Sequence, residues 1–471
     1  MAVAGLASVL LVAMCVAVAV GVTKKNGGES TDAAPSSNGG VSATTKAVQA
    51  ICSPTDYKET CEESLSKANT TDPKQLIKVA FDATVKNIQD AIKNSSLFQK
   101  AADDERTKGA LEVCDETLDT SIEDLKRSFD QIGDFDISKV DDYIDDVKTW
   151  LSAAITYHET CIDAFENTTG DTGEKMKKLL KTSGELLSNG LAMVTDFSTI
   201  LSSLNLGSFS SRRLLADDGI PSFVDARARK SHIFEAKCRP VNGEGFIAKD
   251  IGIENTAGAN KHQAVAVRAS GDKAVFYNVH MDGFQDTLYA HAYRHFYRNC
   301  LISGTIDFIF GDAVAVFQNS RLVVRKPMDN QACMVTAQGR KDKRSVGVTV
   351  IQNCDIVAEP AFLAVKPALS AYLGRPWKEY SRTIIMQSNI DGFIAPEGWS
   401  PWMGTFALDT LYYGEYQNRG AGSNMAKRVK WKGIQKITPQ IAKSFTPEVV
   451  FAGDEWVRGS GIPYVPGFVQ V

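Results

Sequence analysis

The sequence has no excess of basic charge. Its 471 residues include 52 lysines and arginines against 56 aspartates and glutamates, for a net charge of −4. Proteins that bind nucleic acid usually carry a strong surplus of positive charge, so the composition gives no support for a nucleic-acid partner. The chain is also too long for one ordinary domain, and two or three domains are expected.

The first 22 residues contain no charged side chain, and the first charges are Lys24 and Lys25. A run of this length can span a bilayer, although no basic segment precedes it. We predict that residues 1–25 form a signal peptide or signal anchor, the one segment expected to touch a membrane. Three N-glycosylation sequons agree with passage through the secretory pathway: Asn69, Asn94 and Asn167.

Residues 26–44 are rich in glycine and serine and poor in apolar side chains, which predicts a flexible linker. Helical periodicity dominates residues 45–204, beginning with Asp72 and Pro73 as an N-cap and a proline at the first helical position. Apolar stripes at helical spacing predict an all-α four-helix bundle in which His158 is a core residue. The stripes are Ile77, Phe81, Ile88 and Ile92; Ile144, Val147, Leu151, Ile155 and His158; and Met176, Leu179, Leu180, Leu187 and Leu191.

Four cysteines fall in this helical segment: Cys52, Cys61, Cys114 and Cys161. A local pair plus a longer bridge is the economical arrangement, although the sequence allows three connectivities. Cysteine usage agrees with an oxidising compartment. With Ile51-Cys52, Thr55-Asp56-Tyr57 and two later cysteines on long helices, the segment resembles the plant invertase/pectin methylesterase inhibitor domain.

A second boundary, residues 205–225, is rich in serine and glycine and contains Arg212-Arg213-Leu214-Leu215. A dibasic pair in an exposed linker of a secreted protein indicates a protease processing site. The alternative is that both arginines are simply solvated.

The remaining residues, 226–471, lack long helical periodicity and instead repeat an apolar-x-Asn element. Its asparagines are Asn255, Asn278, Asn299, Asn319 and Asn353, with a looser copy at Asn389. Periods near 20 residues, with later insertions, are typical of a β-solenoid, and stacked asparagines can hydrogen-bond in a ladder. The pattern predicts a parallel β-helix.

The repeat also aligns three polar residues, because Gln263, Asp286 and Asp307 each follow a repeat asparagine by eight positions. Stacked coils lie about 4.7–4.9 Å apart, so the three should form a column with the aspartates adjacent. Two carboxylates that close cannot both ionise cheaply, which divides them into an acid and a nucleophile or base. Gln263 and Gln285 would suit an oxyanion better than a metal. The alternative is that the aspartates only hold turns.

Several segments resemble plant pectin methylesterases that carry an inhibitor-like pro-region. These are GFIAKDIGIENTAGANKHQAVAVR, MDGFQDTLYAH, SGTIDFIFGD, VTAQGR and YLGRPWKEYSRTIIM. The resemblance covers nearly the whole chain. It implies a right-handed parallel β-helix that acts on methyl-esterified homogalacturonan in the plant cell wall, secretion, and cleavage at Arg213-Leu214. It also implies intramolecular contact between the bundle and the groove of the β-helix.

The resemblance implies a role for each matching residue. Asp307 would be the nucleophile and Asp286 the acid and then the base. Gln263 and Gln285 would stabilise the oxyanion, and Arg375 would hold Asp307 ionised. Candidates for the substrate-binding wall are Trp377, Phe308, Trp402 and Met403. No cofactor or metal is expected, because His291 and His295 lack an acidic third ligand.

The chain departs from the family between Asp225 and Gly245, where the opening of the β-helix is normally longer. We expect the missing part to include an end cap and early coils, so the β-helix is N-terminally truncated. Two alternatives to an active esterase remain open. One is an inactive homologue that acts as a pectinesterase-inhibitor-type binding protein, and the other is a β-helix glycosidase or lyase, which the paired glutamines and Arg375 argue against.

The second departure concerns cysteines. The positions after successive repeat asparagines are Val279, Cys300, Ser320 and Cys354, whereas the family usually has cysteines at the first and third as well, each paired with the next. Cys300 and Cys354 would be two strand spacings apart, beyond the roughly 7 Å Cα limit for a disulfide. We therefore predict free thiols in this half of the chain.

Overall fold

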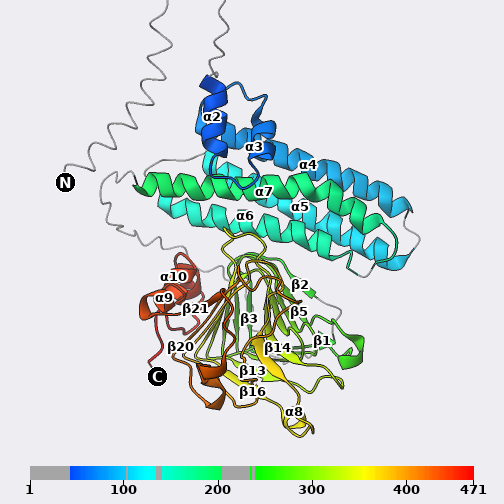
Figure 1. Cartoon of the computed structure of the whole chain (residues 1–471), viewed down its shortest axis with the longest axis vertical. Helices are drawn as coiled ribbons and strands as arrows, with labels where there is room; N and C mark the ends of the chain where they lie inside the picture. Colours follow the sequence, from blue (N-terminus) through cyan, green and yellow to red (C-terminus); the bar gives the residue numbers. More distant parts are fainter. Residues whose placement is uncertain are drawn as a thin grey trace, which may run out of the picture.

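The structure is a computed structural model that describes residues 43–101, 104–133, 140–166, 168–203, 234–235 and 239–470. The predicted leader, most of the first linker, the Arg212-Arg213 motif and the sequon residue Asn167 lie outside the described residues. Helices occupy the N-terminal part and parallel strands the C-terminal part (Figure 1).

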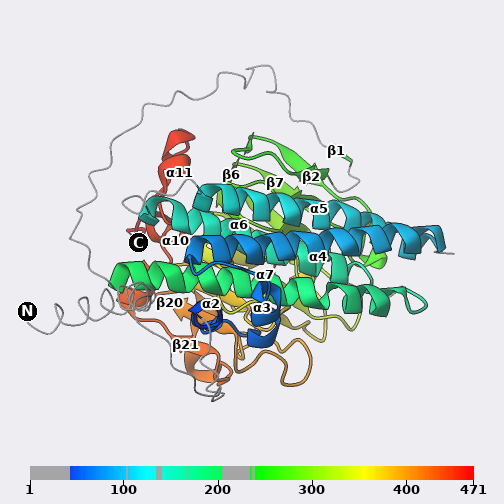
Figure 2. The ribbon, with the colours of Figure 1, turned by 90° about the horizontal axis from the view of Figure 1, so that it is seen from above.

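In the described N-terminal residues, four long helices lie side by side (Figures 1 and 2). They are α4 (Pro73–Ala101), α5 (Glu105–Gly133), α6 (Val140–Asp163) and α7 (Thr172–Ser203), preceded by the short helices α2 (Ala43–Cys52) and α3 (Lys58–Leu65). Most of the predicted apolar stripes form one core, including Phe81, Leu151 and Leu187. Leu179 is an exception, because its side chain is exposed.

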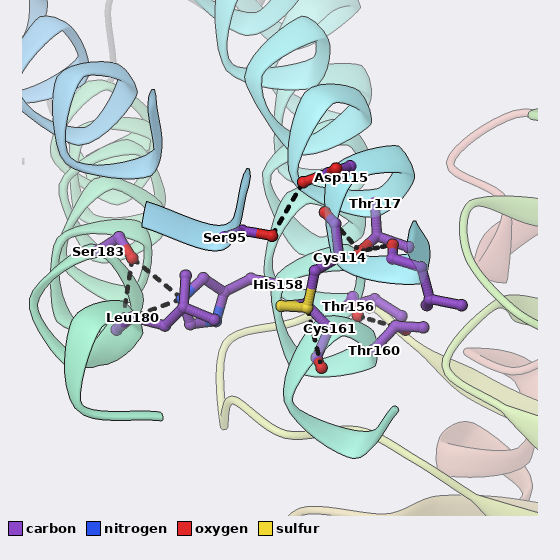
Figure 3. The surroundings of a disulfide bond; sticks show 11 residues. Ser95, Cys114, Asp115, Thr117, Thr156, His158, Thr160, Cys161, Leu180 and Ser183 are labelled. Atoms are coloured by element: carbon purple, nitrogen blue, oxygen red, sulfur yellow. Dashed lines mark hydrogen bonds between the residues drawn. A yellow bond between two sulfur atoms is a disulfide. The ribbon is translucent and has the colours of Figure 1, made fainter. Parts of the chain in front are cut away.

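His158 is buried among these helices, as the sequence predicts. Its Nε2 lies 3.0 Å from the carbonyl oxygen of Leu180 and 3.1 Å from Ser183 Oγ (Figure 3). Burial lowers the pKa of the imidazole, so a neutral ring with satisfied hydrogen bonds packs in the core.

Two disulfides tie the helices together, in the arrangement of a local pair and a longer bridge. Cys52 is bonded to Cys61, which joins α2 to α3. Cys114 is bonded to Cys161 with Cα atoms 4.3 Å apart, which joins α5 to α6 (Figure 3).

The C-terminal part is a parallel β-helix built from three sheets. The seven-stranded sheet contains β1 (Phe234–Glu235), β4 (Gly252–Glu254), β7 (His280–Asp282), β10 (Leu301–Gly304), β13 (Arg321–Val324), β16 (Asp355–Ala358) and β19 (Asn389–Ile390). The six-stranded sheet contains β2 (Arg239–Val241), β5 (Val267–Ala269), β8 (Leu288–Ala290), β11 (Ile309–Gly311), β14 (Cys333–Gln338) and β17 (Ala371–Gly374). Each strand pairs in parallel with the equivalent strand of the next coil.

The third sheet has eight strands, and its central strands are buried on both faces. Its strands are β3 (Ile247–Lys249), β6 (Ala274–Tyr277), β9 (Arg294–Arg298), β12 (Val314–Gln318), β15 (Val348–Gln352), β18 (Arg382–Met386), β20 (Tyr412–Tyr416) and β21 (Ile434–Lys436). Outside it pack α9 (Pro439–Lys443), α10 (Pro447–Val450) and α11 (Glu455–Gly459), through Phe445 and Phe451 among others. A short α8 (Pro360–Leu363) and 3₁₀ turns at Ala259–Lys261, Ala421–Ser423 and Met425–Lys427 complete the described elements.

The apolar-x-Asn repeat marks the ends of four consecutive strands of the eight-stranded sheet, β6, β9, β12 and β15. Its apolar members Phe276, Tyr297 and Phe317 stack inside the β-helix, with ring centroids 4.8 Å and 4.4 Å apart. The asparagines that follow adopt left-handed backbone angles, with φ of 50–53° at the four central copies. Asparagine adopts this conformation more easily than most residues, which explains its recurrence.

The repeat predicted from sequence is wrong at its two ends. Asp250, not Asn255, lies opposite Asn278, whose amide donates to the Asp250 carboxylate at 2.7 Å. At the other end Gln387, with φ of 54°, takes the left-handed position, and Asn389 lies in β19. A direct asparagine ladder contact joins Asn353 to Asn319 at 2.9 Å.

The bundle lies against the turns that follow the strands of the six-stranded sheet (Figure 1). Contacts across this boundary include Tyr293 with Asp124, Thr156 with Asp312, and Ser188 with Asp342. Ion pairs join Arg294 to Asp146 and Arg344 to Asp56. Among helices in the described ranges, none is long and apolar enough to cross a bilayer.

Candidate active site

Asp286 and Asp307 occupy equivalent places on neighbouring coils of the six-stranded sheet. Each lies two residues before a strand, β8 or β11, and the register pairs Leu288 with Ile309. Asp286 therefore lies opposite Asp307, and its backbone N–H donates to the carbonyl of Ile306. Both aspartates have left-handed backbone angles, with φ of 64° and 52°, so the chain turns sharply at each carboxylate.

Arg375, directly after β17, binds the carboxylate of Asp307. Its Nη2 lies 2.6 Å from Oδ2, and its Nε lies 2.9 Å from Oδ1. Burial raises the pKa of Asp307, and the hydrogen bonds and charge of Arg375 offset only part of that rise. A two-point contact of this kind stabilises the ionised carboxylate and fixes its orientation. The guanidinium also lies over the ring of Trp402, 4.3 Å from its centroid.

Asp286 has a different electrostatic environment. Burial, and then the negative charge of Asp307, raise the pKa of Asp286 to about 8. This carboxyl therefore holds its proton at neutral pH, while Arg375 favours the carboxylate form of its neighbour. One group can donate a proton and the other can attack, which is the division of roles expected of a carboxylate pair.

The two glutamines lie beside each other, not in one column with the aspartates. Gln263 forms a parallel β-bridge with Gln285, the residue before Asp286. The predicted column of Gln263, Asp286 and Asp307 is therefore wrong at its first member. The reason is the long connection between β4 and β5, which contains the 3₁₀ turn Ala259–Lys261 and shifts the register. Gln263 is exposed and Gln285 is half-buried.

An aromatic cluster lies next to the carboxylates. Tyr289 of β8 and Phe310 of β11 stack with centroids 4.3 Å apart, and Trp377 approaches both edge-on at 6.3 Å and 5.8 Å. Trp377 is a predicted wall residue, whereas Tyr289 and Phe310 were not predicted. Tyr289 and Phe310 each follow a site aspartate by three positions, a repeated offset that could have identified them.

The other three candidates for the substrate-binding wall differ in how far their side chains are buried. Phe308 is fully buried in the core inside the β-helix, so its assignment to the substrate-binding wall is wrong. It directly follows Asp307, whose left-handed backbone turns the chain so that Phe308 and Ile309 both join the core. Trp402 is half-buried over Arg375, and Met403 is 73% exposed.

Both histidines near the site are buried and hydrogen-bonded. His291 Nε2 lies 2.8 Å from Thr160 Oγ1, and its Nδ1 lies 3.0 Å from Ser270 Oγ. His295 Nδ1 lies 3.3 Å from the hydroxyl of Tyr297. Burial lowers the pKa of both rings. Within the ranges that the structure describes, no group of three or more His, Cys, Asp or Glu side chains could hold a metal ion.

The end of α6 contacts the residues around the site. Lys378, three positions after Arg375, donates to Asp163 of α6 at 2.5 Å. Thr160 lies 3.3 Å from the hydroxyl of Tyr289. The bundle therefore lies next to the aromatic cluster and to the loop that carries Arg375.

Two family models match this chain. One, described as Pectinesterase, matches residues 217–454, and the other, Plant invertase/pectin methylesterase inhibitor, matches residues 46–193. The chain belongs to the pectinesterase family, a family of carboxylic ester hydrolases, and carries an inhibitor-like region at its N-terminal side.

Relatives with both regions match over almost the whole chain. "Probable pectinesterase/pectinesterase inhibitor 21" of Arabidopsis thaliana is 42% identical over 553 aligned residues, covering 98% of this chain and 82% of the relative. "Probable pectinesterase/pectinesterase inhibitor 58" of the same plant is 42% identical, covering 99% and 98%. The first alignment is longer than the 471 residues of this chain, so the relative contains internal segments that are absent here. "Pectin methylesterase from Carrot" is 48% identical with a TM-score of 0.48, covering 49% of this chain and 72% of that structure.

Proposed function

We propose that this chain hydrolyses methyl esters of cell-wall homogalacturonan and releases methanol. The observation that carries the proposal is the difference between the two carboxylates, one held by Arg375 and the other with its pKa raised to about 8. Asp307 attacks the ester carbonyl, and Asp286 gives its proton to the departing methoxide, which leaves as methanol. Asp286 then removes a proton from water, and the hydroxide splits the acyl-enzyme to free the Asp307 carboxylate and a galacturonic acid carboxyl, which loses its own proton to solvent.

Gln263 and Gln285 supply amide N–H groups for the oxyanion that forms during each step. The backbone bridge between Gln263 and Gln285 on adjacent coils, with Gln285 directly before Asp286, supports this assignment. The aromatic cluster of Tyr289, Phe310 and Trp377 offers ring faces and edges for the sugar units. Trp402, whose ring lies against Arg375, and the exposed Met403 would extend this wall. The alternative of a β-helix glycosidase or lyase is disfavoured, because an arginine-held carboxylate with paired amides suits acyl transfer.

The coils that support the carboxylates are present despite the shortened opening of the β-helix. Strand β8, which follows Asp286, is flanked by β5 and β11, and β5 pairs in turn with β2. The truncation therefore affects coils at least two positions away from the dyad. This supports an active esterase over the alternative, an inactive homologue that binds other pectinesterases as an inhibitor.

The helical bundle acts in this proposal as an autoinhibitory pro-region. Its helix α6 lies against Tyr289 and the loop of Arg375, through Thr160 and Asp163, where it would obstruct a polysaccharide. Secretion directed by residues 1–25, and cleavage at Arg213-Leu214, would deliver the β-helix to the plant cell wall. The domain limits proposed are 45–204 for the bundle, 205–225 for the processing linker and 226–471 for the β-helix.

Methanol release from methyl-esterified pectin tests the proposal. The full chain is assayed before and after cleavage at the dibasic motif. We expect release that rises on cleavage and is lost in Asp307→Ala. Asp329→Asn, an exposed aspartate of the same β-helix, is the matched control and should retain activity. A folded, cleaved protein that released no methanol, yet inhibited a second pectinesterase, would favour the binding-protein alternative.

A further inference from the structure

Lys378 lies between the aromatic cluster and two carboxylates of the bundle. Its Nζ is 2.5 Å from Asp163 Oδ1 and 3.7 Å from Glu159 Oε2. The same ammonium is 5.1 Å from the ring centroid of Trp377. Only 13% of the lysine side chain is exposed. A cation so far removed from water requires a carboxylate partner, because leaving it unpaired is costly.

The loop that carries Lys378 also supplies two groups assigned above to the reaction. Arg375 binds Asp307, and Trp377 joins the aromatic cluster. Lys378 is thus three residues from Arg375, which orients the nucleophile, and directly follows Trp377, whose ring can contact a sugar. A carboxylate bound to its ammonium would lie beside a sugar unit that contacts Trp377.

Homogalacturonan has a carboxyl at C6 of every unit, either methylated or free. The free form is an anion of the same chemistry as the Asp163 side chain. We propose that Lys378 binds the free carboxylate of a galacturonate unit near the ester under attack, and that Asp163 of α6 occupies this position as a mimic until the bundle leaves. The inference rests on the proposed function, since it names the part of the substrate that this lysine recognises.

Asp163 is suited to be replaced at Lys378 by a carboxylate of the substrate. Burial raises the pKa of the Asp163 carboxyl to about 6, although Lys378 acts in the opposite direction, so this carboxylate is desolvated at a cost. Other ion pairs between bundle and β-helix, such as Arg344 with Asp56 and Arg294 with Asp146, are made by different turns. They can hold the bundle without the contact at Lys378.

Binding of unesterified pentagalacturonate to the full chain, measured by calorimetry at pH 7, tests the inference. In the wild type Asp163 and Glu159 compete for Lys378. The double variant Asp163→Asn, Glu159→Gln removes both competitors, and we expect binding to tighten by about tenfold or more. Adding Lys378→Gln to that variant should abolish the gain. Asp82→Asn with Asp90→Asn is the matched control, because both are exposed aspartates of α4 paired with lysines and the change in net charge is the same.

Each outcome decides the inference. Failure of the double variant to bind more tightly overturns it. A gain that survives Lys378→Gln also overturns it, because another cation exposed by a loosened bundle would then be the binding group. Methanol release by the same variants separates the two proposals. If methanol is released but binding is unchanged, only the role of Lys378 fails, whereas absence of methanol release from every folded variant contradicts the esterase itself.

Discussion

The guanidinium of Arg375 contacts both oxygens of the Asp307 carboxylate, with its Nη2 at 2.6 Å from Oδ2 and its Nε at 2.9 Å from Oδ1. Lysine in place of the arginine would keep the charge and lose this planar two-point contact. We expect Arg375→Lys to lower kcat for methanol release by about 10²-fold, because Asp307 would no longer be held in one orientation. The control is Arg321→Lys, an exposed residue of β13, and unchanged kcat in Arg375→Lys would contradict the assigned role.

The need for a protonated Asp286 sets an upper pH limit on the rate of the first step, the release of methanol. Methoxide must receive a proton as it leaves, and the pKa of Asp286 is raised to about 8. Below that pH the acid form dominates, and above it the acid is lost. We expect kcat/KM for methanol release to fall about tenfold per pH unit above pH 8. Asp286→Asn should remove this descending limb together with most of the activity, and a wild-type profile that stays level to pH 9.5 would exclude Asp286 as the acid.

Gly339 sets the position of Trp377. A Cβ atom at residue 339 would lie 2.7 Å from Cε3 of the indole, closer than real Cβ contacts permit. Gly339→Ala should therefore displace the ring from its place against Phe310. We expect a several-fold rise in KM for pectin with a smaller change in kcat, because the substituted residue does not contact the reacting atoms. The matched control is Gly243→Ala, where a Cβ meets open space, and equal KM values in the two variants would argue against the role of the indole.

The thiols of the β-helix offer a test of its stability. Cys300, Cys333 and Cys354 are free and buried, as predicted. The strand register places Val279 next to Cys300 and Ser320 next to Cys354 on adjacent coils, and the Ser320 N–H donates to Cys354 Sγ at 3.3 Å. Coil spacing falls within the range for a disulfide.

We expect Val279→Cys with Ser320→Cys to form two bridges and to raise the free energy of unfolding by roughly 2–4 kcal/mol for each. Thiol titration of the unfolded, unreduced variant should find two fewer thiols than the wild type. Ser320→Ala, which removes the hydroxyl without adding sulfur, should leave the count unchanged. A variant with more thiols than the wild type would show that the coils cannot close these bridges.

Features with a local cause were predicted well. Apolar residues at helical spacing bury one face of each helix, so the bundle and its core histidine followed from the spacing. Asn278 and Asn319 recur because each turn of the β-helix needs a left-handed residue, and that need is visible in a single chain. The placement of Asp286 opposite Asp307 could be predicted for the same reason, since short and equal connections separate these coils.

Other features depended on the three-dimensional packing. The sequence could not show that Gln263 pairs with Gln285. The connection before β5 is long, and its length alone does not say which of its residues pair with the next coil. The interior position of Phe308 depends on the sharp turn at Asp307, and the contact between Lys378 and Asp163 joins residues 215 positions apart. The sequence alone determined the types of element and the residues able to carry the chemistry, because periodicity and turn preference act over a few neighbours. Only the tertiary structure decided which of those residues meet, because that depends on packing between segments far apart in the chain.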